Sequence, residues 1–191
     1  MPYTESMRLP FNEAKATQAA ACLLRLRGNR MSYLKLIKLL YLLDREALLR
    51  WGRPVTTDRY VSMDNGPVVS RVYSLIRDEQ PPGSSRIWRR FISPPEDWEV
   101  SLIADPGNDE LSRAEESLID EIFSAHGARG RWELVDLSHG LPEWRDPEGG
   151  AIPIEYRDIL RAGRKTESEI ASIEQDLEAL AAVDSLMVTP D

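Results

Sequence analysis

The stretch that decides the fold runs from residue 35 to residue 76 and reads KLIKLLYLLDREALLRWGRPVTTDRYVSMDNGPVVSRVYSLI. Its first half belongs to a helical pattern over 33–51, with Ser32 as the N-cap and Gly52 as the residue that ends the helix. Apolar residues cover most of the circumference of this helix, which is typical of a central buried helix. They are Leu34, Leu36, Ile37, Leu39, Leu40, Tyr41, Leu42, Leu43 and Leu48.

One carboxylate interrupts this apolar helix. Asp44 falls on the line of Ile37, Tyr41 and Leu48, so we expect it to be at least partly buried. A buried carboxylate needs a charged or hydrogen-bonding partner. The candidate partners are Arg59, Tyr60 and His139. We favour a structural ion pair over a general acid or base, because no second chemical group stands beside Asp44 in the sequence.

The second half of the stretch predicts a strand, a turn and a helix. Residues 58–63 alternate between apolar and polar side chains, as a short strand does. Asn65-Gly66 is a turn signal, and Pro67 suits the first position of a helix, where its missing N–H is not needed. The apolar face of that helix would consist of Val68, Val69, Val72, Tyr73 and Ile76.

The rest of the chain predicts more helices than strands. Capping boxes begin two helices, at Ser112 and Thr166. The predicted elements are helices over 13–27, 113–126, 131–139, 154–162 and 166–187, and a hairpin of strands over 86–92 and 98–104. The expected fold is α+β, mainly α: a compact helical domain around a buried central helix, with a small antiparallel β-sheet and a C-terminal acidic helix. We place the main domain at residues 1–165 and an acidic helical extension at 166–191.

Composition restricts the class of protein. The chain has 191 residues, of which 42% are hydrophobic and 29% charged, as in an ordinary globular protein. Cys22 is its single cysteine, which excludes a disulfide framework and a cysteine-based zinc site. The sequence has no apolar run of signal-peptide or membrane-span length, so we expect a cytoplasmic protein with no membrane association.

Charge is distributed unevenly along the chain. Residues 24–91 contain 14 Lys/Arg and 6 Asp/Glu, whereas residues 96–191 contain 8 Lys/Arg and 24 Asp/Glu, within a net charge of −8. Such asymmetry concerns partners and not the fold. An acidic half is expected to repel nucleic acid and attract a basic protein, although a merely solvated surface would have the same composition.

The sequence contains few groups that could perform catalysis. Asp136, Ser138 and His139 resemble a hydrolase set, but adjacent Ser and His side chains on a helix point in different directions. No Gly-x-Ser-x-Gly turn accompanies them. The two histidines, His126 and His139, lack the spacing of a metal site. We expect no catalytic residue, no metal and no cofactor, and the protein is expected not to be an enzyme.

Nucleic-acid binding has weak support. Arginines surround Trp88 over residues 86–90, which combines cationic and aromatic character. A recognition helix would need several polar side chains that reach the bases. The predicted helix over 67–77 offers only Ser70, Arg71, Ser74 and Arg77.

Three ordered motifs in the central stretch resemble the Panacea domain, the family of SocA-like antitoxins and of the phage-associated protein GepA. The first motif comprises Lys35, Leu36, Lys38, Leu39, Leu40, Tyr41 and Asp44; the second Gly52, Pro54, Val55, Asp58 and Tyr60; the third Gly66, Pro67, Val68 and Tyr73. A later element, LSHGLPEW over 137–144, supplies Ser138, His139 and Trp144. Ser62 and Met63 depart from the family pattern of alanine followed by an aromatic residue. The resemblance covers roughly residues 13–162 and assigns 1–165 to the Panacea domain.

The resemblance implies a function that the residues alone do not. It implies an antitoxin that neutralises a cognate protein toxin, encoded by an adjacent gene, through direct binding. The alternative is a proteolytic adaptor that delivers a toxin to the protease ClpXP; a DNA-binding regulator or a hydrolase is less favoured. The motif residues would fix the strand–turn–helix in place, with the Ser138-His139-Trp144 element as its brace.

The acidic C-terminal helix is the predicted toxin contact. It could also pack on its own core or form a homodimer, and packing on the same chain is the default. The residues proposed for the toxin contact are Glu167, Ile170, Ile173, Glu174, Leu177 and Leu180.

Overall fold

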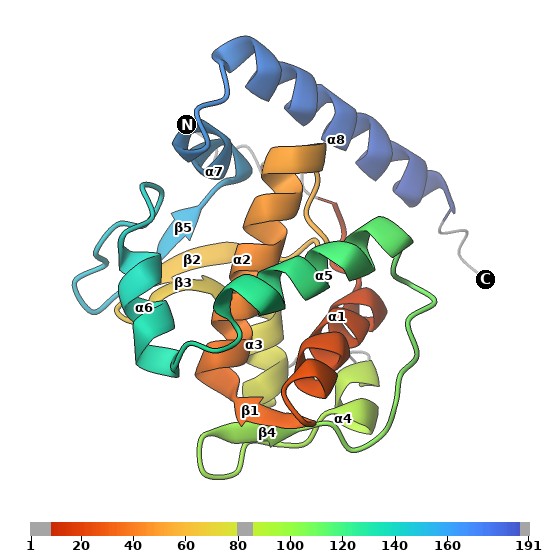
Figure 1. Cartoon of the computed structure of the whole chain (residues 1–191). Coiled ribbons are helices and arrows are strands. Elements are labelled where there is room, and N and C mark those ends of the chain that lie inside the picture. The colour runs from red at the N-terminus through yellow and green to blue at the C-terminus, as the bar shows by residue number, and fades with distance from the viewer. Residues whose placement is uncertain (1–8, 80–85, 188–191) are drawn as a thin grey trace.

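The computed structural model describes residues 9–79 and 86–187 (Figure 1). Helices predominate and two small antiparallel sheets complete the fold, which confirms the predicted α+β class. The elements in chain order are α1 (Glu13–Leu26), β1 (Arg30–Ser32), α2 (Tyr33–Trp51), β2 (Tyr60–Met63), β3 (Gly66–Val69), α3 (Ser70–Arg77), α4 (Ile87–Phe91), β4 (Glu99–Ser101), α5 (Arg113–His126), α6 (Arg131–His139), β5 (Ile152–Ile154), α7 (Tyr156–Ala162) and α8 (Glu167–Met187).

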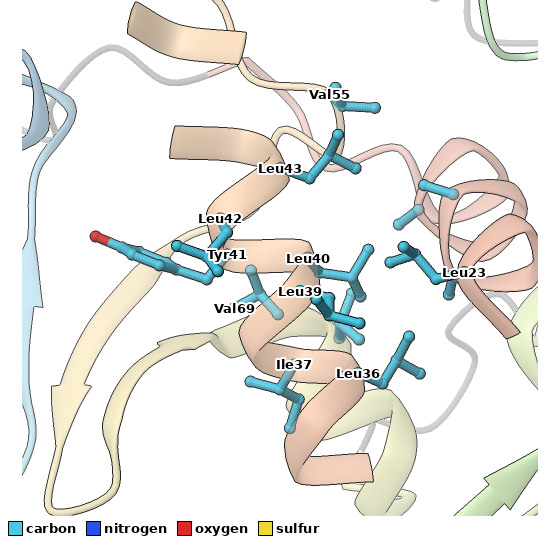
Figure 2. Close-up of a cluster of buried hydrophobic side chains, with 14 of the residues drawn as sticks. Leu23, Leu36, Ile37, Leu39, Leu40, Tyr41, Leu42, Leu43, Val55 and Val69 are labelled. Atoms are coloured by element: carbon cyan, nitrogen blue, oxygen red, sulfur yellow. The ribbon is translucent and has the colours of Figure 1, made fainter. Parts of the chain in front are cut away.

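Helix α2 is the centre of the core, as its apolar circumference predicts. It contacts α1, α5, α6, α7 and strand β3, so neighbours surround it on most sides (Figure 1). The side chains of Leu36, Leu39, Leu40 and Leu43 are fully buried, and Figure 2 shows them on the side of α2 that faces α1, with Ile37 and Tyr41 on the other side. Burial of each such leucine contributes about 2 kcal/mol to stability. Gly52 ends the helix in the left-handed conformation (φ 72°), as predicted.

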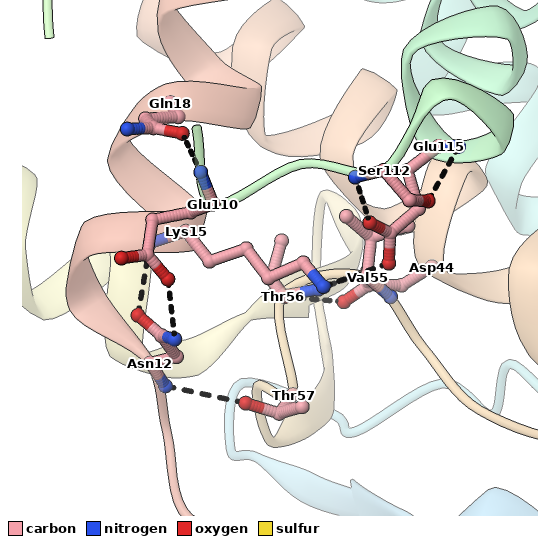
Figure 3. Close-up of polar contacts among 10 residues, drawn as sticks. All are labelled: Asn12, Lys15, Gln18, Asp44, Val55, Thr56, Thr57, Glu110, Ser112 and Glu115. Atoms are coloured by element: carbon pink, nitrogen blue, oxygen red, sulfur yellow. Dashed lines mark hydrogen bonds and ion pairs between the residues drawn. The ribbon is translucent and has the colours of Figure 1, made fainter. Parts of the chain in front are cut away.

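Polar contacts join helices α1 and α5 across the core. Asn12 caps α1 by accepting a hydrogen bond from the backbone N–H of Lys15 (2.9 Å), and the Lys15 ammonium pairs with Glu115 on α5 (2.8 Å; Figure 3). Glu115 also completes the capping box with Ser112 that the sequence predicts. The N-termini of both helices are therefore fixed relative to each other.

The larger sheet has the strand order β3-β2-β5 and is antiparallel throughout. Pro67 lies in its edge strand β3 and pairs with Ser62, so the prediction that Pro67 begins a helix is wrong. A proline is tolerated there because an edge strand leaves some of its N–H groups without a strand partner. Helix α3 begins three residues later, at Ser70.

The predicted hairpin over 86–92 and 98–104 is also wrong in its first half. Residues 87–91 form helix α4, whose Trp88 is fully buried, and strand β4 pairs with β1 instead. Only an isolated bridge, between Ile92 and Leu102, joins the two predicted strands. A short apolar run fits both periodicities, and here the burial of Trp88 favours the helix. No helix in the described part of the chain is long and apolar enough to cross a membrane.

Candidate functional site

A buried carboxylate on α2 organises the segment that follows this helix. Asp44 is fully buried, and one of its oxygens accepts hydrogen bonds from the backbone N–H groups of Val55 (3.0 Å) and Thr56 (2.8 Å; Figure 3). Its other oxygen accepts from the Thr56 hydroxyl and from the Tyr60 hydroxyl (2.9 Å). We call Asp44, Val55, Thr56 and Tyr60 the Asp44 cluster. It fixes the segment between α2 and β2 to the middle of the central helix.

The predicted partners of Asp44 are only partly right. Tyr60 is confirmed, whereas Arg59 is exposed and His139 bonds elsewhere. A charged partner would itself have to be buried, and four donors of the chain's own backbone and hydroxyls satisfy the carboxylate without one. The sequence analysis missed Thr56, whose only signal was its position beside the Val55 of the second motif.

A second buried carboxylate, Asp58, caps the N-terminus of helix α3. Its oxygens accept hydrogen bonds from the backbone N–H groups of Arg59 (2.6 Å), Arg71 (2.7 Å) and Val72 (3.0 Å). Arg71 and Val72 lie in the first turn of α3, and the N-cap residue Val69 provides no side-chain cap. Asp58 therefore caps α3 from the segment just before β2, and its carboxylate also interacts favourably with the positive end of the helix dipole.

Two buried lysines of α2 satisfy carbonyl groups of other elements. The Lys38 ammonium donates to the carbonyl of Pro67 (2.7 Å), and the Lys35 ammonium donates to those of Gly127 (2.5 Å) and Arg129 (2.8 Å) at the end of α5. Lys38 is 1% exposed and thus cannot meet a ligand from solvent. Both lysines connect α2 to backbone that would otherwise lack donors.

The 137–144 element contacts the turn between β2 and β3. A ring nitrogen of His139 lies 2.9 Å from the carbonyl oxygen of Asp64, and the indole N–H of Trp144 donates to the carbonyl of Met63 (3.1 Å). The His139 and Trp144 rings lie against each other, with centroids 4.2 Å apart. These contacts are those of the predicted brace. Ser138 is buried and its hydroxyl donates to the carbonyl of Val135 (2.8 Å).

A further carboxylate that the sequence analysis missed connects this element to α2. Glu143 accepts a hydrogen bond from the Tyr41 hydroxyl (3.0 Å) and pairs with Arg45 (2.6 Å). Tyr41 belongs to the first motif and Glu143 to LSHGLPEW, so the hydrogen bond joins two motifs directly. The only signal for Glu143 in the sequence was its charge, between Pro142 and Trp144.

Burial shifts the pKa values of three of these groups toward neutrality. Burial raises the pKa of Asp44 to about 6 and that of Asp58 to about 7, against the opposing effect of their hydrogen bonds. Burial also lowers the pKa of Lys38 to about 7. In the unfolded chain the carboxyl groups titrate near 4 and the lysine near 10.

We expect the free energy of unfolding to pass through a minimum near pH 7. The folded chain holds the protons of Asp44 and Asp58 more tightly than the unfolded chain, so stability falls as pH rises from about 4 to 7. Lys38 has the opposite sign, and its contribution rises from pH 7 to about 10. Each pH unit between the folded and unfolded pKa of a group contributes about 1.4 kcal/mol, so the acidic limb of the two carboxyl groups is expected to amount to several kcal/mol. Urea unfolding at constant ionic strength measures both limbs, and ¹³C NMR of the two carboxyl carbons would contradict the prediction if both titrated below pH 4.

The region that contains most of these polar contacts matches a known protein family. The family described as antitoxin SocA-like, Panacea domain matches residues 36–145. The chain belongs to this family. No curated protein and no solved structure matches the chain with significance. The matched region of the Panacea domain contains the whole Asp44 cluster, Asp58, Lys38 and the 137–144 element.

The C-terminal helix of this Panacea protein, α8, packs on the same chain. Ile170 and Leu177 are buried, and Ile173 packs against the core, so these three side chains of the predicted toxin contact offer little surface to a partner. Glu167 and Glu174 pair with Arg161 and Arg157 of α7, both at 2.8 Å, whereas Leu180 is 41% exposed. A toxin contact on α8 stays a prediction.

The described residues do not assemble the nucleic-acid, hydrolase or metal sites that the sequence analysis considered and disfavoured. Trp88 is fully buried, and hence no aromatic platform lies between the arginines of 86–90. Asp136 is exposed while Ser138 is buried, and the described residues contain no cluster of three or more His, Cys, Asp or Glu side chains that could hold a metal ion.

An open groove of about 520 Å³ lies beside the N-terminus of α2. Its lining includes four aromatic side chains and one arginine, which we call the aromatic groove: Tyr33, Tyr73, Trp98, Arg131 and Trp132. Ile37 and Val68 form part of its floor. Trp98 is 67% exposed and Trp132 is 55% exposed. The third motif contributes Tyr73 and Val68, so the groove is built directly on the motif scaffold.

Proposed function

We propose that this protein is a non-enzymatic antitoxin that neutralises a cognate protein toxin by direct binding. The observation that carries the proposal is the match of residues 36–145 to the SocA-like antitoxin, Panacea domain family. The family name supplies the class of activity, and the contacts of the motif residues are compatible with it.

The burial of the motif side chains supports a binding role over a catalytic one. Lys38, Asp44 and Asp58 are at most 1% exposed, and each is bonded to backbone or hydroxyl groups of the same chain. A catalytic group must reach the reacting atoms of a substrate. These three side chains instead hold α2, β2 and α3 in one arrangement, on which a recognition surface can be rigid before binding.

The test is to express the open reading frame adjacent to this gene, alone and together with this protein. Growth arrest by the neighbour alone, relieved by co-expression and accompanied by co-purification of the two proteins, is the expected result. The neighbour's half-life should be unchanged by co-expression. A half-life that falls only in cells containing ClpXP would assign the adaptor role instead. Failure of the pair to associate, or the absence of rescue, would contradict the antitoxin proposal.

A matched control separates binding from catalysis. The double variant Ser138→Ala, His139→Ala removes the only Ser-His pair considered for a hydrolase. If it folds and still rescues growth, an enzymatic role for this pair is excluded, whereas lost rescue by a folded variant would contradict the proposal.

A further inference from the structure

Trp98 of the aromatic groove occupies a backbone position that is unfavourable for tryptophan. Asp97 and Trp98 form a two-residue hairpin turn, in which Glu96 and Glu99 exchange backbone hydrogen bonds of 2.9 Å in both directions. Their φ angles are 50° and 66°, in the left-handed region. Such turns strongly favour Asn-Gly or Asp-Gly, because glycine at the second central position adopts a positive φ without strain.

The exposure of Trp98 means that core packing does not explain its presence. Its side chain is 67% exposed and meets the ring of Tyr33, with centroids 6.1 Å apart. The backbone N–H of Tyr33 also donates to the Trp98 carbonyl (3.0 Å), which holds the turn against the start of α2. A strained residue that presents a large apolar surface to solvent indicates a role in recognition.

The groove combines these rings with positive charge. Burial raises the pKa of the Tyr33 hydroxyl, and the nearby charges of Arg77 and Arg131 oppose that shift. The Arg131 guanidinium lies 5.5 Å from the centre of the Trp132 ring, and Arg131 forms no ion pair with any residue in 9–79 or 86–187. Arg77 lies over the ring of Tyr73 and donates to its hydroxyl (3.2 Å), but it lies outside the groove lining and pairs with Glu79 (2.8 Å), so Arg131 supplies the positive charge of the groove.

One acidic side chain, Asp64, also lines the groove, and its carboxylate accepts a hydrogen bond from the backbone N–H of Gly149 (3.0 Å). Exposed tryptophan, tyrosine and arginine side chains are the residues that most often dominate binding energy in protein interfaces. An occupant that uses the whole groove would place an apolar or aromatic side chain between the rings and a carboxylate beside the Arg131 guanidinium.

We infer that the aromatic groove binds a segment of the partner protein in which an aromatic or aliphatic side chain is flanked by carboxylates. The inference rests on the proposed function, which makes that partner the toxin. It differs from the predicted contact on α8, because the groove lies on the start of α2 and α6 and attracts acidic, not basic, residues.

The decisive variant is Trp98→Gly, because it is expected to raise the stability of the fold and to weaken binding of the partner. Glycine relieves the strained turn, so the midpoint of urea unfolding is expected to rise by roughly 0.5 M. The dissociation constant of the complex with the purified neighbouring gene product is expected to increase about 30-fold, as for an interface hot spot. Unchanged affinity would overturn the inference. A lower unfolding midpoint would do so too, because the tryptophan would then serve the fold.

Two further variants test the ring and the charge. Trp132→Ala is expected to weaken binding about 30-fold and Arg131→Glu about 10-fold. The matched controls lie outside the groove: Ile103→Ala removes a 58% exposed apolar side chain and Arg113→Glu reverses an exposed charge on α5. Both are expected to bind within twofold of the original protein. Controls that weaken binding as much as the groove variants would overturn the inference.

A second arm does not depend on the neighbouring gene product. Ten-residue synthetic peptides with a central tryptophan flanked by glutamates are titrated into this protein, and their dissociation constants are compared with those of peptides that have lysines in the same positions. At least tenfold tighter binding of the glutamate series, lost in Arg131→Glu, supports the inference; no difference between the series overturns it.

If the neighbour fails to bind while the glutamate peptides bind, the proposed pairing fails and the groove assignment stands. A variant that changes only the oligomeric state would assign the groove to a second copy of this chain and overturn the inference.

Discussion

Replacing Asp44 by alanine is expected to lower the free energy of unfolding by about 4 kcal/mol. The change removes one acceptor group and leaves four donors without it: the N–H groups of Val55 and Thr56, and the hydroxyls of Thr56 and Tyr60. Each buried donor left unsatisfied costs about 1–3 kcal/mol, and water that enters the space would recover part of this. The midpoint of urea unfolding, with an unchanged m-value, measures the loss.

The matched control is Asp120→Ala, which removes an aspartate from the exposed side of α5. It is expected to change the free energy of unfolding by less than about 0.5 kcal/mol. Asp44→Asn is expected to fall between the two, since its amide oxygen can still accept from backbone N–H groups while its NH₂ group meets other donors. Equal stability of the Asp44 and Asp120 variants would show that the Asp44 cluster does not hold the segment in place.

The parts of the fold that the sequence predicts are those set by local rules. The apolar circumference of α2 requires burial wherever the helix lies, and the Ser112 capping box satisfies its own donors. Pro67 and Trp88 show where local rules end. Whether Pro67 begins a helix or lies in an edge strand depends on which strand pairs with β3, and whether 87–91 is helical depends on the pocket that receives Trp88. In both cases tertiary contacts, and not local sequence, decide the secondary structure.

The candidate site likewise has one part that the sequence predicts and one part that it does not. The sequence predicts the strand and the turn, and it places Tyr60 among three candidate partners of Asp44. The favoured ion pair is wrong, since hydrogen bonds satisfy Asp44, and strand β3 lies between the turn and the helix. The aromatic groove could not be predicted, since its lining comes from α2, α3, α6 and the turn before β4, which are far apart in the chain. Its one local signal was a tryptophan after Asp97, in a place where a turn favours glycine.

Replacing Gly66 by alanine is expected to lower the free energy of unfolding by about 3 kcal/mol. Gly66 has φ +88°, a conformation that costs an alanine about 1 kcal/mol. Its added Cβ would also overlap the Ser138 hydroxyl oxygen and lie 2.9 Å from the Lys38 nitrogen. Both neighbours belong to the scaffold and are buried, so neither can move without breaking its own hydrogen bond to Val135 or Pro67.

Gly28 provides a control with the same backbone conformation. Its φ is also +88°, but a Cβ there would meet nothing within 4 Å, so Gly28→Ala should cost only the conformational term of about 1 kcal/mol. The difference between the two variants in urea unfolding isolates the contact with Ser138 and Lys38. Adding Ser138→Ala to Gly66→Ala removes the overlapping oxygen and is expected to recover about half of that difference. Equal losses at the two glycines would mean that the turn and α6 are not in close contact, and the brace formed by the 137–144 element would then lie elsewhere.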